Sequence, residues 1–215
     1  MSNLPVYRYF PLPDVKACIR LLEIFQGANH EHIHGAIRIY NIGESPPFIA
    51  LSYAWGNEPL TEFMVTDSAK NYHLSSPHKG LHSIRDVVRP SWLWVDAICI
   101  HQADEIEKAG QISLMAKIYS NATKVIVWLG PAFNGSDRLL HELPSLVETV
   151  KHIDGHVFID RLETYGLPQR YDPLWSSLAE FMSLTWFRRL WVRQEAVLAN
   201  ELIFLCGSMT IPFAG

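Results

Sequence analysis

Short, almost wholly apolar runs alternate in the middle of the chain with segments in which apolar residues recur every three or four positions. Runs of this kind at 48–53, 92–96 and 124–129 are typical of strands that are covered on both faces. The intervening segments 77–89 and 105–120 have helical spacing, and each follows a residue that caps helices well. The alternation predicts one sheet in which the three strands are parallel neighbours, with the helices packed on it.

Further strands and helices are predicted on either side of this core. Strands are expected at 17–25, 37–40, 63–66, 72–74, 202–205 and 209–212, the last four as two hairpins. Helices are expected at 139–153, 174–184 and 188–199. The predicted fold is thus α/β, a parallel sheet flanked by helices with added β-hairpins. We divide the chain into an N-terminal extension, residues 1–47, and a main domain, residues 48–215.

The composition is that of a folded domain. Hydrophobic residues make up 48% of the 215 residues and charged residues 19%, which excludes a disordered chain. No apolar run is long enough to cross a bilayer, and the N-terminus lacks the basic start and apolar stretch of a signal peptide. We therefore expect a cytoplasmic location. A net charge of −4 without a basic block argues against nucleic-acid binding.

Neither the cysteines nor the histidines form a specific metal pattern. The three cysteines lack CxxC spacing, so reduced and buried thiols are expected. His30, His32 and His34 would share one face of a strand, a pattern that can hold a metal, but no acidic or cysteine partner makes it specific. The sequence therefore predicts no metal site.

Polar side chains are expected to gather beyond the carboxyl ends of the central strands, where open parallel sheets bind their ligands. The residues at these ends are Ser52, Tyr53, Trp55 and Gly56 after the first strand, and Asp96 and Gln102 after the second. Hydroxyl, glycine and aromatic residues suit a ribose, a phosphate and a stacked base. The simpler alternatives are that Ser52 only ends a strand and that Asp96 only caps a loop.

A second cluster lies in the segment 188–195, which carries three arginines, a tryptophan and a glutamate. On a helix, Trp191 and Glu195 are four positions apart and share a face. A carboxylate beside an indole lies in a partly apolar site, where its pKa rises or its charge becomes an effective stabiliser of positive charge. The alternative is that Glu195 pairs with Arg188 or Arg189 as a structural ion pair.

Three long sequence blocks occur in order along the chain: ALSYAWG at 50–56, LWVDAICIHQ at 93–102, which runs on to VWLG at 127–130, and RRLWVRQEAVLA at 188–199. These blocks resemble those of the fungal heterokaryon-incompatibility (HET) domain family. Long ordered blocks are far more specific than a short motif. The sequence departs from the family pattern at Asn57, where aspartate is usual, and at His101, where asparagine is usual.

The resemblance implies a cell-death effector of fungal non-self recognition, a form of innate immunity. The family is similar to TIR domains, so the resemblance also implies a TIR-like or flavodoxin-like sheet. Some TIR domains cleave NAD with a glutamate. By this resemblance the chain would be an NAD+ glycohydrolase, with NAD as substrate and no resident cofactor, in which Glu195 is the first and Asp96 the second catalytic candidate. The expected nucleotide contacts are Ser52, Tyr53, Trp55, Gly56, Gln102, Arg189 and Trp191.

A second hypothesis from the same resemblance is non-enzymatic. The domain would then be a death-signalling interaction module that acts by self-assembly and contacts other death-signalling modules. An exposed apolar patch and a cleft without an acidic residue would favour this hypothesis. Self-association is expected under both hypotheses.

Overall fold

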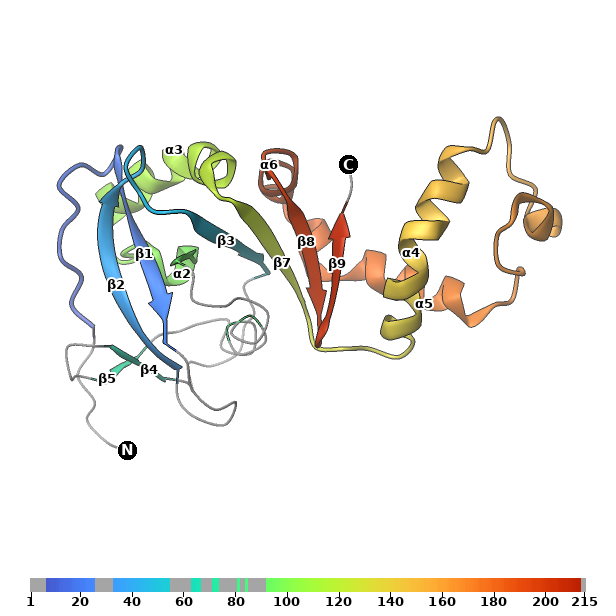
Figure 1. The fold of residues 1–215 in the computed structure, drawn as a ribbon, viewed down its shortest axis with the longest axis horizontal. Coiled ribbons are helices and arrows are strands. Elements are labelled where there is room, and N and C mark those ends of the chain that lie inside the picture. The colour runs from blue at the N-terminus through green and yellow to red at the C-terminus, as the bar shows by residue number, and fades with distance from the viewer. Residues whose placement is uncertain are drawn as a thin grey trace.

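A single mixed sheet runs through the part of the chain that the computed structural model describes, residues 7–25, 33–54, 63–66, 71–73, 81, 84 and 92–213. Its strands are β1 (Cys18–Ile24), β2 (Ile33–Asn41), β3 (Phe48–Tyr53), β4 (Phe63–Thr66), β5 (Asn71–His73), β6 (Trp92–Trp94), β7 (Lys124–Gly130), β8 (Leu202–Cys206) and β9 (Met209–Phe213). Their order across the sheet is β5-β4-β2-β1-β6-β3-β7-β8-β9 (Figure 1).

The centre of the sheet is parallel. β3 lies between β6 and β7 and is parallel to both, with Ala50 opposite Trp94 on one side and Ser52 opposite Val127 on the other. β8 extends the parallel group beyond β7. The prediction of adjacent parallel strands in these three segments is therefore confirmed. Every residue of β3 is buried, as expected of a strand covered on both faces.

The outer strands make the sheet mixed. β1 pairs antiparallel with both β2 and β6, and β9 pairs antiparallel with β8. β4 is antiparallel to β5 and parallel to β2. The two strands predicted before residue 48 and both predicted hairpins are thus present, and those two strands belong to the same sheet as the strands that follow them. The α/β class, with helices flanking a sheet and added hairpins, is confirmed.

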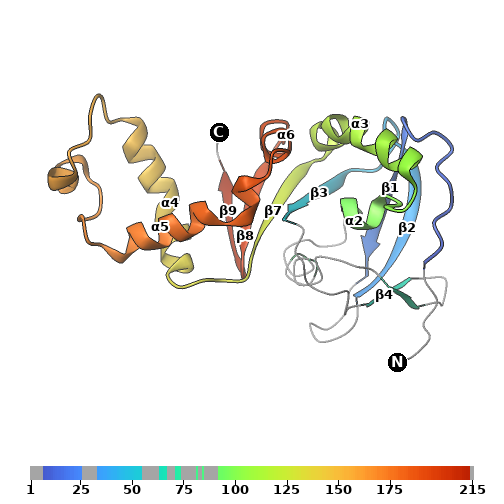
Figure 2. The ribbon, with the colours of Figure 1, turned by 180° about the vertical axis from the view of Figure 1, so that it is seen from behind.

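The helices are α2 (Asp96–Cys99), α3 (Glu105–Asn121), α4 (Ser136–Lys151), α5 (Pro173–Ser183) and α6 (Val192–Val197), and two 3-10 turns span Ile159–Tyr165 and Thr185–Arg188. α3 and α6 contact each other, whereas α4 and α5 pack together beyond β9 (Figures 1 and 2). Among the described residues, no helix is both long enough and apolar enough to cross a bilayer.

The predicted helices are largely present, but two starts are shifted, and the helix expected at 139–153 begins at Ser136. The helix expected at 105–120 begins as predicted, because the Asp104 carboxylate accepts hydrogen bonds from the backbone N–H groups of Ile106 and Glu107. Of the helix expected at 77–89, the structure describes Leu81 and Ile84, which are both buried. The helix expected to begin at residue 188 begins instead at Val192, because the chain first forms a 3-10 turn.

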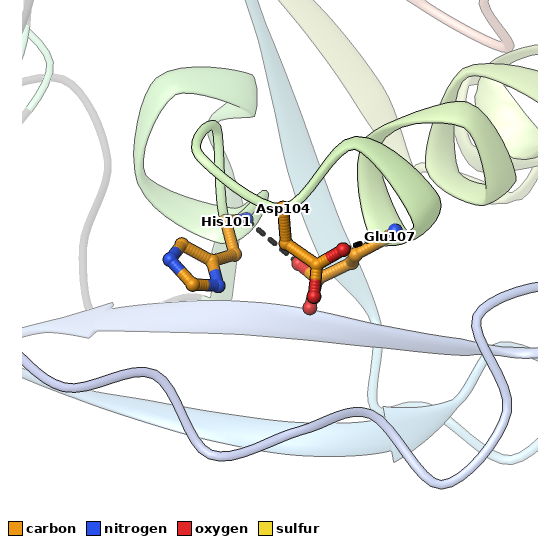
Figure 3. A group of neighbouring side chains, drawn as sticks. All are labelled: His101, Asp104 and Glu107. Atoms are coloured by element: carbon orange, nitrogen blue, oxygen red, sulfur yellow. Dashed lines mark hydrogen bonds between the residues drawn. The ribbon is translucent and has the colours of Figure 1, made fainter.

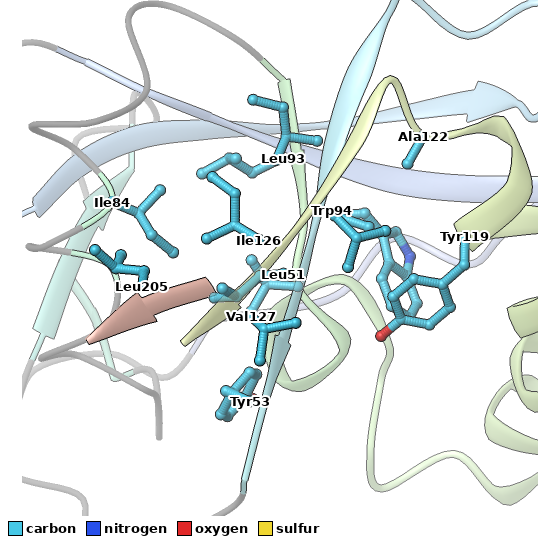
Figure 4. Packing of buried hydrophobic residues seen from close by; sticks show 14 of the residues in the cluster. Leu51, Tyr53, Ile84, Leu93, Trp94, Tyr119, Ala122, Ile126, Val127 and Leu205 are labelled. Carbon is cyan, nitrogen blue, oxygen red and sulfur yellow. The ribbon is translucent and has the colours of Figure 1, made fainter. Parts of the chain in front are cut away.

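The core lies between the sheet and its helices, and it holds the carboxyl ends of the central strands in place (Figure 4). Leu51 of β3, Leu93 of β6 and Ile126 of β7 belong to one buried cluster. Trp94 of β6 meets Tyr119 of α3 edge to face, with ring centroids 5.6 Å apart. The three cysteines of the chain are buried and free, as predicted.

Candidate functional site

The carboxyl ends of β3 and β6 place three of the predicted site residues at one edge of the sheet. Ser52 and Tyr53 are the last residues of β3, and Asp96 follows β6 and begins α2. The chain passes from β3 to β4, which lies on the β6 side of β3, and it passes from β7 to β8 on the opposite side, so the connections diverge between β3 and β7. Such a divergence is where ligands bind in open α/β sheets.

Glu195 of α6 reaches this edge from the far end of the sequence. The Ser52 hydroxyl donates a hydrogen bond to Glu195 Oε2. The indole Nε1 of Trp186, in the 3-10 turn before α6, donates to Ser52 Oγ at 2.6 Å. Arg189 donates to the carbonyl of Tyr53, and its Nη2 lies 3.7 Å from Glu195 Oε1. These contacts tie the 186–195 segment to the end of β3.

Glu195 is a buried carboxylate whose surroundings disfavour its charge. Its exposed fraction is 1%. Burial raises the pKa of Glu195, and the negative charge of Asp96 raises it further; the hydrogen bond from Ser52 and the charge of Arg189 act in the opposite direction without cancelling the rise. A carboxylate in such a poorly solvated site interacts strongly with any positive charge that develops beside it.

Two tyrosines join the carboxylates in this cluster. Burial raises the pKa of the Tyr53 hydroxyl far above its usual range, and the neighbouring Asp96 raises it further. Burial also raises the pKa of Tyr119, which lies within the electrostatic reach of both Glu195 and Asp96. Both phenols therefore stay protonated and can act only as neutral hydrogen-bonding groups at neutral pH.

A second buried glutamate, Glu107 of α3, provides the contrast. Burial would raise its pKa, but hydrogen bonds from Arg20 and from the His101 N–H outweigh that effect, so the pKa of Glu107 is lowered. Arg20 of β1 binds both carboxylate oxygens, at 2.5 and 2.9 Å. Glu107 is thus a fully paired structural ion, whereas Glu195 retains an environment that opposes its charge.

Glu107 also belongs to a group of three neighbouring side chains of the types that bind metal ions. The Glu107 carboxylate, the Asp104 carboxylate and the His101 imidazole offer ligand atoms within 4.8 Å of one another (Figure 3). Asp104, however, caps α3, and Glu107 is engaged by Arg20 and by the His101 N–H at 2.7 Å. A helix start and an ion pair therefore account for the grouping. His30 and His32 lie outside the described residues.

The structure brings Ser52, Tyr53, Asp96, Arg189 and Glu195 together. The remaining predicted residues differ: Gln102 donates to the carbonyl of Asp96 at 2.9 Å, Trp191 is 44% exposed, and Trp55 and Gly56 lie outside the described residues. Two of the three alternatives noted from the sequence have some basis, because Glu195 faces Arg189 and one Asp96 oxygen accepts from the N–H of Ala97. The catalytic and nucleotide-binding roles of these residues stay predictions.

Sequence reasoning missed Trp186 and gave Tyr119 only a packing role. The indole that touches the Ser52–Glu195 pair is Trp186, whereas the predicted neighbour, Trp191, precedes α6 with an exposed side chain. The available signal was position: Trp186 stands two residues after the helix predicted at 174–184 and two residues before the arginine pair. Tyr119 was recognisable only as a residue of the inward face of its helix.

Replacing Glu195 with Gln is expected to raise the melting temperature at pH 7.5 by a few degrees. Because the folded state raises the pKa of Glu195, folding favours the protonated form, and the cost of the charge appears as the pH rises above the ordinary value of 4.5. A gain of roughly 1 kcal/mol corresponds to about 2–4 °C in a chain of this size. Thermal unfolding at pH 4 should show the difference disappear, and the exposed Glu180→Gln should change nothing at either pH.

A lower melting temperature for Glu195→Gln at pH 7.5 would instead identify Glu195 as a structural partner of Arg189. That outcome would remove the argument that separates Glu195 from Glu107.

Comparison with known proteins finds a family model that covers most of the chain. The family model described as heterokaryon incompatibility protein (HET) matches residues 48–195, from the first residue of β3 to Glu195 itself. "Heterokaryon incompatibility protein 6, OR allele" of Neurospora crassa is 31% identical over 241 residues, which cover 96% of this chain and 35% of that protein. The chain therefore spans about a third of the length of this curated relative. No solved structure matches it. On the family match and this identity, the chain belongs to the heterokaryon incompatibility (HET) family.

Proposed function

We propose that this chain is a cell-death effector of fungal non-self recognition that hydrolyses NAD, or a related nucleotide, at the N-glycosidic bond. The observation that carries the proposal is the buried Glu195 carboxylate, hydrogen-bonded by Ser52 at the carboxyl end of the parallel strands. A raised pKa in a cluster of this kind is typical of functional carboxylates, and Glu107 in the same chain illustrates the structural kind.

The chemistry follows from the charge that develops on the ribose. As the bond between C1′ and the nicotinamide nitrogen breaks, its electron pair leaves with neutral nicotinamide and C1′ acquires oxocarbenium character. A carboxylate beside this centre stabilises the positive charge, most strongly where water is excluded. Water then adds to C1′ and loses a proton, which yields the ribosyl product. Glu195 supplies the negative charge, and Asp96 lies close enough to influence it.

Access to Glu195 sets a condition on turnover. Its side chain is only 1% exposed, so a substrate can reach it only if the contacts around it rearrange. Arg189 lies beside Glu195 and is the more exposed of the two, with 23% of its side chain exposed. It links the 186–195 segment to the Tyr53 carbonyl. We therefore expect turnover to depend on a change in this segment, which self-association of the domain would provide.

The test is nicotinamide release from NAD and from NADP, measured by chromatography with dilute protein and with concentrated protein in a crowding agent. Release is expected to appear with concentrated, assembled protein and to be far slower in the dilute sample. A folded, assembled protein that releases nicotinamide from neither nucleotide would exclude the proposed hydrolysis.

The second candidate function is the interaction module, and exposed apolar side chains around α6 favour it. Leu190 and Val197 are each 81% exposed, and Trp191 lies between them in the sequence at 44%. Cell killing in a fungal host separates the two functions. Under the enzymatic hypothesis, killing is lost with Glu195→Gln. If killing survives Glu195→Gln and is lost with the double variant Leu190→Ser and Val197→Ser, the interaction module is the correct function.

A further inference from the structure

The hydrogen bonds around Ser52 have a direction that the chemistry of the groups fixes. Ser52 Oγ has two side-chain partners in the described structure, Trp186 Nε1 at 2.6 Å and Glu195 Oε2. An indole N–H can only donate, so the Ser52 oxygen must accept from Trp186. The one hydroxyl hydrogen of Ser52 is then left for Glu195, which as a carboxylate can only accept.

We propose that Trp186 is a positioning residue that holds the Ser52 hydroxyl as a constant donor to Glu195, and so keeps this carboxylate oriented and ionised for the hydrolysis proposed above. The inference rests on that function for its catalytic meaning, but the hydrogen-bond chain itself is measurable without any turnover. Trp186 acts through Ser52 and need not touch the substrate.

The packing of Trp186 suits this task, because the indole is fixed on several sides. It is 3% exposed and meets Phe187 edge to face, with ring centroids 5.0 Å apart. It also meets Phe204 of β8 edge to face at 5.5 Å. The indole is thereby held between its own 3-10 turn and the sheet, so its N–H keeps its direction towards Ser52.

In the described part of the chain, the other charged and titratable groups that face Glu195 come from separate elements. Arg189, in the turn before α6, lies 3.7 Å from Oε1 and carries a constant positive charge. Asp96 of α2 acts on Glu195 as a like charge, and Tyr119 of α3 lies nearby as a neutral phenol. Within the described residues, Asp96 is therefore the neighbour whose titration could be confused with that of Glu195, and the experiment must separate them.

The first experiment follows the indole N–H resonance of Trp186 by 1H–15N NMR as the pH is changed. The resonance is assigned in the wild-type protein by through-bond NMR experiments, and its loss in Trp186→Phe checks the assignment. It is expected to titrate in the wild-type protein, because protonation of Glu195 weakens its bond with Ser52 and changes the bond that Ser52 accepts. The titration should vanish in Glu195→Gln and should persist in Asp96→Asn with a lower midpoint, since a like charge has been removed. A resonance that does not titrate, or that still titrates in Glu195→Gln, would overturn the proposal.

The second experiment measures the midpoint of the Glu195 carboxyl carbon by 13C NMR in Trp186→Phe. Losing the donor frees Ser52 to rotate away from the carboxylate, so the midpoint should rise by roughly half to one pH unit. Trp175→Phe is the matched control, because the Trp175 indole donates instead to the Gln169 carbonyl at 2.9 Å; it should leave the midpoint unchanged. An unchanged midpoint in folded Trp186→Phe would overturn the proposal. If this variant does not fold, the titration of the Trp186 indole N–H in the wild-type protein and in Glu195→Gln is the deciding measurement.

Activity provides the link to the proposed function. The acid limb of the pH profile for nicotinamide release should move to higher pH in Trp186→Phe by the same amount as the carboxyl midpoint. If the wild-type protein releases no nicotinamide while both titrations behave as expected, the hydrolysis is rejected and the positioning of Ser52 by Trp186 stands.

Discussion

Glu195→Gln is expected to lower nicotinamide release from NAD about a hundredfold or more while the protein remains folded. Glutamine keeps the size of the side chain and can still accept a hydrogen bond from Ser52, so the change removes little besides the negative charge. That charge is the group proposed to stabilise the oxocarbenium-like ribose. Initial rates at saturating NAD, measured on protein whose assembly has been checked by light scattering, give the loss.

The matched control is Glu180→Gln, which makes the same substitution at an exposed position of α5. This variant should keep the wild-type rate. Normal turnover by folded, assembled Glu195→Gln would show that another group performs the chemistry. Asp96→Asn is the next variant to measure, because Asp96 is the other carboxylate of the cluster.

Arg20→Met is expected to lower the free energy of unfolding by roughly 3–5 kcal/mol, because it leaves the buried Glu107 without its partner. No other single substitution proposed for this chain is expected to cost as much. Arg20 is 1% exposed and donates to Glu107 and to the carbonyls of Cys99 and Phe10, at 3.1 and 2.6 Å. Methionine fills much of the same volume but offers no donor. Urea unfolding at pH 7.5 followed by tryptophan fluorescence measures the loss.

Two further variants show whether the pair itself is responsible. Arg170→Met breaks an exposed ion pair with Asp160 and should cost no more than about 1 kcal/mol. Replacing both buried partners, Arg20→Met with Glu107→Leu, should recover much of the stability because no buried charge is left unpaired. The pKa of Glu107 is lowered in the folded state, so the pair contributes its stability above the ordinary value of 4.5, and the loss should shrink as the pH falls through the folded pKa. An equal cost for Arg20→Met and Arg170→Met would contradict this account.

The central fold could be predicted because its signals are local. The runs at 48–53, 92–96 and 124–129 are almost wholly apolar, a pattern typical of strands covered on both faces. The position of β1 beside β6 could not be predicted in the same way, because strand order depends on contacts between distant segments. Local alternation identifies β1 as a strand but does not name its neighbours.

The candidate site was predictable to a similar extent. Ser52 and Asp96 follow from the rule that ligands bind at the carboxyl ends of parallel strands, and Glu195 was singled out by its segment and by the family resemblance. The neighbouring indole was misassigned because a continuous helix from residue 188 was assumed. The 3-10 turn at Thr185–Arg188 changes the helical phase, so Trp186 rather than Trp191 faces the buried pair.

The antiparallel pairing of β1 with β6 has a consequence for how this domain can be produced as a fragment. The family match begins at Phe48, which makes residue 48 an obvious start for a fragment of the domain. It would lack β1, which covers one side of β6, and it would lack the hydrogen bond of the Tyr9 hydroxyl to the Ile98 carbonyl. An uncovered strand edge invites pairing between copies, and fragments that begin at residue 48 are therefore prone to aggregate. A fragment that retains residues from Tyr7 onward keeps the sheet closed on that side.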